Sequence, residues 1–232
     1  MKQRHPPPVA VLFDLDGTIV DTMGFLFDAF RHAVAPFVSQ LPSNAEVVAS
    51  FGPAERECIA RYLQKAEQAG TLTSTDAQRV DRATERFFNF YEQGHDQVRA
   101  FPGMLDLLHA LHRQSWPLGV FTGKGRRGAE YTLSELKLWP QIVHCLVSSD
   151  DVTRVKPDPQ GVQLALQKMQ AQPATTLFIG DAPADIMAGH AAQVQTAAAL
   201  WGSFDHAATL AAEPTFAFRE VAELRQLLLP AL

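Results

Sequence analysis

The sequence predicts an α/β fold, a Rossmann-like parallel sheet core with a helical cap domain inserted after the first strand. Short apolar segments rich in β-branched residues alternate with helical segments along most of the chain, as in a parallel sheet covered by helices. One stretch, residues 22–99, breaks this alternation and carries amphipathic, helix-like sequence. The 232 residues, 47% of them hydrophobic, suffice for one large core and a smaller module. We expect a core of residues 1–21 and 100–232 and a cap of residues 22–99.

Six short apolar segments are the expected strands of the core. In chain order they are 9–13 (VAVLF), 117–121 (PLGVF), 142–147 (IVHCLV), 176–179 (TLFI), 196–200 (TAAAL) and 214–218 (PTFAF). Apolar residues at helical spacing predict the helices. Those of the cap are 25–34, 54–69 and 76–93, and a further helix at 105–114 leads into the second strand.

The composition argues for a small-molecule partner. The net charge of -5, with no run of basic residues, disfavours nucleic acid. No stretch of about 18 apolar residues could span a membrane, and three prolines interrupt the N-terminal segment where a secretion signal needs apolar residues. We therefore expect a cytoplasmic protein in which Cys58 and Cys145 are buried, reduced thiols. The sequence alone does not predict the oligomeric state.

Polar side chains gather where the predicted strands end. Asp14 follows the first strand, Thr122 follows the second, and Asp181 follows the segment TLFIG. A single aspartate in this position is more often the cap of the next helix. Several together predict a binding site, because ligands of open α/β sheets lie at the carboxyl edge of the strands.

The segment VLFDLDGT suggests a chemical role for its aspartates. It does not fit a calcium loop, because its glycine comes at the fourth place instead of the sixth and a strand precedes it. Asp14, at the end of a buried strand, would be held rigidly enough to attack a substrate. Asp16, two residues on, could exchange protons with the entering or leaving group. Gly17 would let the backbone pass close to a ligand.

Four segments, in this order, resemble the motifs of the haloacid dehalogenase superfamily of phosphatases: DLDGT from Asp14, VFTGK around Thr122, RVKPDP around Lys156, and GDAPADI from Asp181. The resemblance covers nearly the whole chain. It implies that Asp14 is a nucleophile that becomes an aspartyl-phosphate and that Asp16 is the general acid and base. It also implies that Thr122 and Lys156 bind the transferred phosphoryl group.

The resemblance further implies a magnesium site formed by Asp14, the carbonyl of Asp16, Asp181 and Asp185. This fits the chemistry, since a carboxylate nucleophile and a phosphoryl group repel each other and a hard cation with oxygen ligands offsets that repulsion. Many relatives carry serine or threonine after the aspartate of the fourth motif, whereas this chain has Ala182. Direct and water-mediated contact of Asp185 with the metal both stay open.

A helical block between the first two motifs resembles the small cap of subfamily I. The segments TGK, DDVTRVKPDP and ALWG resemble phosphoglycolate phosphatases and nearby pyrophosphatases. The resemblance therefore implies a Mg2+-dependent phosphatase acting on a small phosphorylated metabolite similar to phosphoglycolate. A pyrophosphatase and a hexose-phosphate mutase on the same scaffold are alternatives. Arg56 in the cap is a candidate for substrate recognition, although an ordinary surface charge on a helix is an equally good interpretation.

A second pattern, GKGRRG at 123–128, fits the dinucleotide fingerprint G-x-G-x-x-G and follows a predicted strand. A dinucleotide-binding oxidoreductase is thus an alternative from another class. That hypothesis leaves the other motifs unexplained, and so short a pattern recurs by chance. Gly123 and Lys124 could equally bring an N–H group and an ammonium toward a substrate phosphate.

Overall fold

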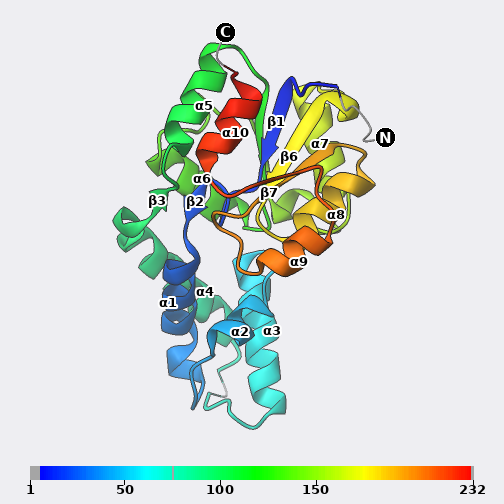
Figure 1. Ribbon diagram of the computed structural model, residues 1–232. Coiled ribbons are helices and arrows are strands. Elements are labelled where there is room, and N and C mark those ends of the chain that lie inside the picture. The colour runs from blue at the N-terminus through cyan, green and yellow to red at the C-terminus, as the bar shows by residue number, and fades with distance from the viewer. Residues whose placement is uncertain (1–5, 75, 231–232) are drawn as a thin grey trace.

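The computed structural model describes residues 6–74 and 76–230, and its centre is a six-stranded sheet in the order β5-β4-β1-β6-β7-β8 (Figure 1). Every neighbouring pair in this sheet is parallel. The strands are β1 (Ala10–Phe13), β4 (Leu118–Phe121), β5 (Cys145–Val147), β6 (Thr176–Gly180), β7 (Gln195–Ala199) and β8 (Phe216–Phe218). The predicted α/β fold is confirmed, and a strand lies in each of the six expected segments.

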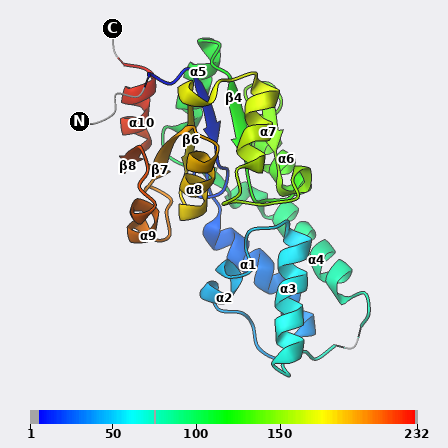
Figure 2. The same cartoon turned by 90° about the vertical axis from the view of Figure 1, so that its right-hand side faces the viewer.

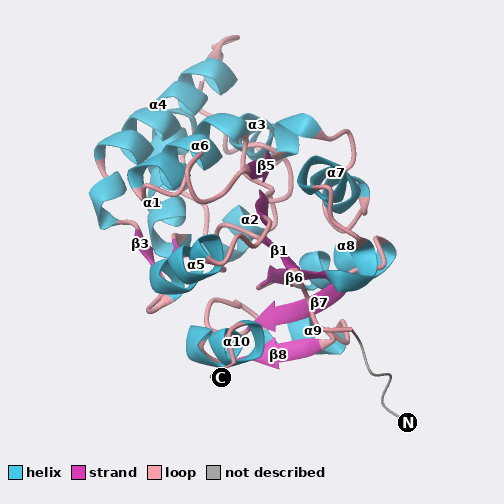
Figure 3. Cartoon of the chain, turned by 90° about the horizontal axis from the view of Figure 1, so that it is seen from above, coloured by secondary structure: helices cyan, strands magenta, loops and turns pink. Residues whose placement is uncertain are grey.

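Helices cover both faces of the sheet (Figure 3). In β1, Val11 and Phe13 pack with helices of one face and Leu12 packs with helices of the other, because successive side chains of a strand point to opposite faces. The first face carries α5 (Met104–Arg113), α6 (Arg126–Glu135) and α10 (Val221–Leu228), and the second carries α7 (Gln160–Met169) and α8 (Pro183–Ala191). A short helix, α9 (His206–Ala211), lies against α8.

Between β1 and α5 the chain forms a group of helices beyond the tips of β1 and β4 (Figure 2). They are α1 (Met23–Val34), α2 (Asn44–Val48), α3 (Glu55–Gln68) and α4 (Arg79–Gln93). Their buried side chains form an apolar cluster of their own. The predicted division into a core and a cap stays a prediction, and residues 1–5 of that core lie outside the described residues.

Helix α4 illustrates how the sequence builds this group. Ala83, Phe87 and Tyr91 recur every four residues and are buried, since positions i and i+4 share one helix face. Burial of a phenylalanine side chain contributes about 1.5–3 kcal/mol. The cluster is therefore sufficient to order helices whose other faces are charged.

Two very short strands join the helical group to the rest of the chain. β2 (Val20–Asp21) and β3 (Arg99–Ala100) pair antiparallel, with Val20 opposite Ala100 and Asp21 opposite Arg99. The chain consequently leaves and re-enters the α/β part at adjacent points. Four 3₁₀ turns complete the described elements, at Ala35–Phe37, His95–Gln97, Ser149–Asp151 and Pro173–Thr175.

The two cysteines are buried and unpaired, as predicted. Burial raises the pKa of Cys58 to about 12 and that of Cys145 to about 11, so both thiols stay protonated near neutral pH. Within the described part of the chain, no helix has the length and apolar character needed to cross a membrane.

Candidate active site

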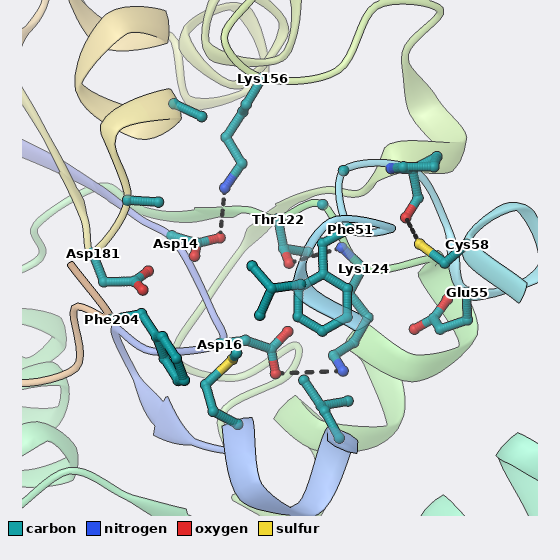
Figure 4. Close-up of a pocket in the computed structure, with 18 of the residues that line it drawn as sticks. Asp14, Asp16, Phe51, Glu55, Cys58, Thr122, Lys124, Lys156, Asp181 and Phe204 are labelled. Carbon is teal, nitrogen blue, oxygen red and sulfur yellow. Dashed lines mark hydrogen bonds and ion pairs between the residues drawn. The ribbon is translucent and has the colours of Figure 1, made fainter. Parts of the chain in front are cut away.

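The strand order fixes where a site can form. The chain passes from β1 to β4 and β5 on one side and then continues with β6, β7 and β8 on the other side of β1. The direction of winding thus reverses at β1, and a crevice forms at the carboxyl edge of the sheet at such a point. A cavity of about 350 Å³ lies there, between this edge and the helices α1–α4 (Figure 4).

Lys156 joins two carboxylates at the bottom of this cavity. Its Nζ donates to Asp14 Oδ1 at 2.8 Å and to Asp185 Oδ1 at 2.6 Å. Burial raises the pKa of Asp14, Lys156 lowers it and Asp185 raises it, and the resulting pKa is about 7. Burial alone would lower the pKa of Lys156, but the two carboxylates raise it above the ordinary lysine value. Lys156 therefore stays charged.

Asp14, Asp181 and Asp185 each offer a carboxylate oxygen, and these oxygens lie within 4.8 Å of one another. Burial and the other two carboxylates raise the pKa of Asp181 well above its ordinary range. Gly17 makes this closeness possible, since a Cβ there would lie 2.5 Å from Asp181 Oδ2 and its φ of +78° favours glycine. Three converging carboxylates suit a hard divalent cation.

Ala182 does not leave Asp185 unsupported. The backbone N–H of Ala182 donates to Asp185 Oδ2 at 3.0 Å, so both oxygens of this carboxylate have partners. The orientation of Asp185 is thus fixed without a hydroxyl at position 182.

Asp16 lies beside this group, nearer the helices. Thr22 Oγ1 donates to Asp16 Oδ1 at 2.6 Å, and Lys124 Nζ lies 3.4 Å from the same oxygen. Lys124 is itself buried, with its Nζ 4.6 Å from the centre of the Tyr91 ring. Burial alone would lower the pKa of Lys124, but Asp16, Tyr91 and Glu55 raise it, and the lysine stays charged.

The second motif also borders the cavity. Thr122, at the end of β4, is buried and its Oγ1 accepts the backbone N–H of Lys124 at 3.1 Å. Gly123 lines the same space. The structure thus brings together at this edge Asp14, Asp16, Gly17, Thr122, Gly123, Lys124, Lys156, Asp181 and Asp185.

Arg56 lies elsewhere. Its guanidinium donates to Asp81 at 2.7 Å on the surface of the helical group and does not line the cavity. Its neighbour Glu55, which the sequence analysis did not select, lines the cavity instead. Burial raises the pKa of Glu55, and the nearby Lys124 lowers it in part.

Glu55 explains two of the three glycines at 123–128, Gly125 and Gly128. Its Oε2 accepts the backbone N–H of Gly125 at 3.0 Å, and a Cβ at Gly128 would lie 2.7 Å from its Oε1. In a dinucleotide site these glycines make room for a pyrophosphate, whereas here a carboxylate of α3 fills that room. A dinucleotide site would also need an acid for the ribose after the next strand. Asp150 and Asp151 lie there, but both contact Arg126. The geometry does not favour the dinucleotide hypothesis.

Comparison with known proteins supplies a family. The sequence profile of the haloacid dehalogenase-like hydrolases matches residues 11–199. A pyrophosphatase PpaX from Anoxybacillus flavithermus is 31% identical over 221 residues, which cover 94% of this chain and 95% of the relative. A pyrophosphatase PpaX from Oceanobacillus iheyensis is 34% identical over 196 residues, which cover 84% of this chain and 85% of the relative.

Solved structures share the fold. One described as a predicted phosphoglycolate phosphatase from Haemophilus somnus superposes with a TM-score of 0.81 at 21% identity, covering 94% of this chain and 97% of its own. At that identity the likeness extends to the fold alone.

Proposed function

The chain belongs to the haloacid dehalogenase-like hydrolases, and on this premise we propose that it is a Mg2+-dependent phosphatase that forms an aspartyl-phosphate on Asp14. The observation that carries the proposal is the convergence of Asp14, Lys156 and Asp185 at the carboxyl edge of the sheet, beside one cavity. A buried carboxylate held by a lysine is rigid and partly stripped of water, as a nucleophile should be.

The carboxylates of Asp14, Asp181 and Asp185 fit a divalent cation. We propose Mg2+, held by these three residues together with the carbonyl of Asp16. When bound, such an ion offsets the negative charge of the nucleophile and the phosphoryl oxygens.

In the proposed reaction, a carboxylate oxygen of Asp14 attacks phosphorus and the bond from phosphorus to the leaving oxygen breaks. Asp16 gives that oxygen a proton, so an alcohol departs. Water then attacks the phosphorus of the aspartyl-phosphate, Asp16 takes a proton from it, and the bond to Asp14 breaks to release phosphate. Thr22 and Lys124 both contact Oδ1 of Asp16, which leaves Oδ2 to carry the proton.

Lys156 and Thr122 are proposed to hold the phosphoryl group during both steps. Lys156 stays charged beside Asp14, where it can neutralise a phosphoryl oxygen. The Thr122 hydroxyl accepts the N–H of Lys124 and keeps its own hydrogen free to donate. A hexose-phosphate mutase would use the same residues but return the phosphoryl group to a sugar.

The names of the relatives favour a second candidate, a pyrophosphatase. It uses the same nucleophile and differs only in the leaving group, which is phosphate instead of an alcohol. Hydrolysis rates of pyrophosphate and of 4-nitrophenyl phosphate, measured side by side with Mg2+, distinguish a pyrophosphatase from a monoesterase.

The test of the proposed mechanism is intact-protein mass after rapid quenching with 4-nitrophenyl phosphate. Asp16→Asn should slow turnover by about 10²- to 10⁴-fold and accumulate a phosphoryl adduct that maps to Asp14. Asp14→Asn should show neither turnover nor adduct, because an amide is a far poorer nucleophile. Asp21→Asn, which changes an exposed acid of the same segment, is the control and should behave as the wild type. An adduct on Thr122, or one that persists in the Asp14 variant, contradicts the proposal.

A further inference from the structure

We infer that the leaving group of the substrate is apolar and carries no negative charge of its own. The inference rests on the proposed function and concerns the part of the cavity that faces away from Asp14. There the leaving group would lie against α1, α3, α4 and the loop before α3.

The side chains that these elements and the loop before α9 turn toward the cavity are largely apolar. We call six of them the apolar wall: Met23, Leu26, Phe30, Phe51, Phe87 and Phe204. Figure 4 shows Phe51 and Phe204 bordering the space in front of Asp14 and Asp16. Apolar walls stabilise an apolar ligand in proportion to the surface removed from water.

The two cations of the cavity are already matched by acids. Lys156 contacts Asp14 and Asp185, and Lys124 lies 3.4 Å from Asp16 with Glu55 close by. Each ammonium thus has a carboxylate oxygen within 3.4 Å. No arginine or further lysine of the described residues lines the cavity.

The charged residue that the helical group itself contributes is an acid. Glu55 Oε1 is buried and has no hydrogen-bond partner among the described residues. A second negative charge on the substrate would therefore meet apolar surface and a carboxylate. Desolvating an anion without a partner is unfavourable, and placing it near a like charge adds to that cost.

Two anionic leaving groups are disfavoured by this arrangement. Phosphoglycolate carries a carboxylate on its leaving group, and pyrophosphate has a second phosphate there. The cavity of about 350 Å³ instead suits a phosphate ester of an aromatic or branched aliphatic alcohol of modest size. The phosphoglycolate-like substrate of the sequence analysis came from motifs of the core, which do not form the apolar wall.

The test compares two substrates that share one benzyl phosphate group, 4-methylbenzyl phosphate and 4-carboxybenzyl phosphate, with Mg2+ and the full-length protein. The reacting oxygen is the same in both, and they differ in charge at the far end. We expect kcat/KM to favour the methyl compound by about 100-fold or more. Phosphoglycolate and pyrophosphate should be hydrolysed more slowly than the methyl compound.

A variant pair locates the cause. Phe51→Arg places a cation in the apolar wall at a residue that is 36% exposed. It should reduce the ratio of kcat/KM for the methyl compound to kcat/KM for the carboxylate compound by at least about tenfold. Leu41→Arg adds the same charge at an exposed position that does not line the cavity, and it should leave the ratio unchanged. Val48→Arg, at another exposed lining residue, replaces Phe51→Arg if that variant unfolds.

Equal rates for the two benzyl phosphates, or a preference for the carboxylate compound or pyrophosphate, overturn the inference and leave the phosphatase proposal intact. An unchanged ratio in folded Phe51→Arg and Val48→Arg also overturns it. If no phosphate compound is hydrolysed, including 4-nitrophenyl phosphate, the proposed function fails and this inference fails with it.

Discussion

Lys156 is a single positive charge beside three carboxylates, so it neutralises only part of their negative charge. It contacts Asp14 and Asp185, and Asp181 lies beside both. The raised pKa values of Asp14 and Asp181 follow from this excess of negative charge together with burial. A cation at this group would remove the excess, so binding a metal should stabilise the folded protein.

The first prediction concerns metal removal. Excess chelator should abolish hydrolysis of 4-nitrophenyl phosphate, and added Mg2+ should restore it. Saturating Mg2+ should raise the melting temperature of the chelated protein by about 5 °C or more. Differential scanning calorimetry and the chromogenic assay measure the two effects.

Two variants control this prediction. Asp185→Asn should need at least about tenfold more Mg2+ for half-maximal activity, because it removes one oxygen ligand and its charge. Asp158→Asn changes an acid that pairs with Arg154 outside the cavity. It should change neither the Mg2+ concentration for half-maximal activity nor the rise in melting temperature with Mg2+. Full activity in excess chelator would be incompatible with the metal site.

Residue positions could be predicted where they depend on strand ends. Asp14, Thr122 and Asp181 meet because parallel strands end at one edge, and the sequence pattern contains that information. Which of Glu55 and Arg56 faces the cavity could not be predicted in this way. Neighbouring residues on a helix point about 100° apart, and the sequence does not say which face of α3 turns inward. The available signal was the glycine spacing at 123–128, which indicates that something approaches α6 closely.

At the scale of elements, α3 contacts the start of α6 through the side chain of Glu55. Glu55 lies between Gly125 and Gly128, and the carboxylate accepts the first N–H of the α6 terminus. A negative charge is favourable at a helix N-terminus. This contact is therefore one of those that hold the helical group at the carboxyl edge of the sheet.

The second prediction tests this contact with a double-mutant cycle. Gly128→Ala should lower the free energy of unfolding by about 1–3 kcal/mol, because the new Cβ displaces Glu55 and breaks its hydrogen bond to Gly125. In a Glu55→Ala background the same change should cost less, since alanine is the better helix former and the displaced carboxylate is gone. Urea unfolding of the four proteins gives the coupling energy.

Gly24→Ala is the matched control for this cycle. It adds a methyl group to a helical glycine of α1 with open space around it, so it should be neutral or slightly stabilising. A Gly128→Ala cost that is the same with and without Glu55 would mean that Lys124, which also lies close to that Cβ, is the group displaced.

The six core strands could be predicted because each contains an apolar run, which is buried in five strands and partly exposed in β8. β2 and β3 could not, since two residues each give no periodicity to detect. Helix α2 was also missed. It is only five residues long, although Ser43 and Glu46 form a capping box that marks its start.

At the scale of the whole molecule, the apolar side chains of α1–α4 form a cluster separate from those of the sheet. Contacts between the two parts include polar ones, as in the pair Tyr91 and His95, which both contact the Thr132 hydroxyl of α6, and aromatic ones such as Phe27 with Phe204. We propose that residues 22–99 are a cap module on a core that can fold by itself.

The third prediction follows from the pairing of β2 with β3. Because Val20 lies opposite Ala100, the ends of the segment are adjacent and a short Gly-Ser linker can replace residues 22–99. The shortened protein should keep a cooperative thermal transition, since Val98 is the single buried member of the two sheet clusters, among the described residues, that the linker removes. It should hydrolyse 4-nitrophenyl phosphate slowly and lose the preference for the uncharged benzyl phosphate. A product without a cooperative transition would show that the boundary is wrong.

The contact of Glu55 with the two glycines of α6 has an evolutionary consequence. Neither side of it can change freely, because a side chain at position 128 would overlap the carboxylate and a shorter residue at 55 would leave the N–H of Gly125 without its acceptor. Positions 55, 125 and 128 should therefore vary together among related sequences, although 70 residues separate the first two. A lineage that exchanged its cap for another would have to change the start of α6 at the same time, so these three positions record which caps and cores have been inherited as a pair.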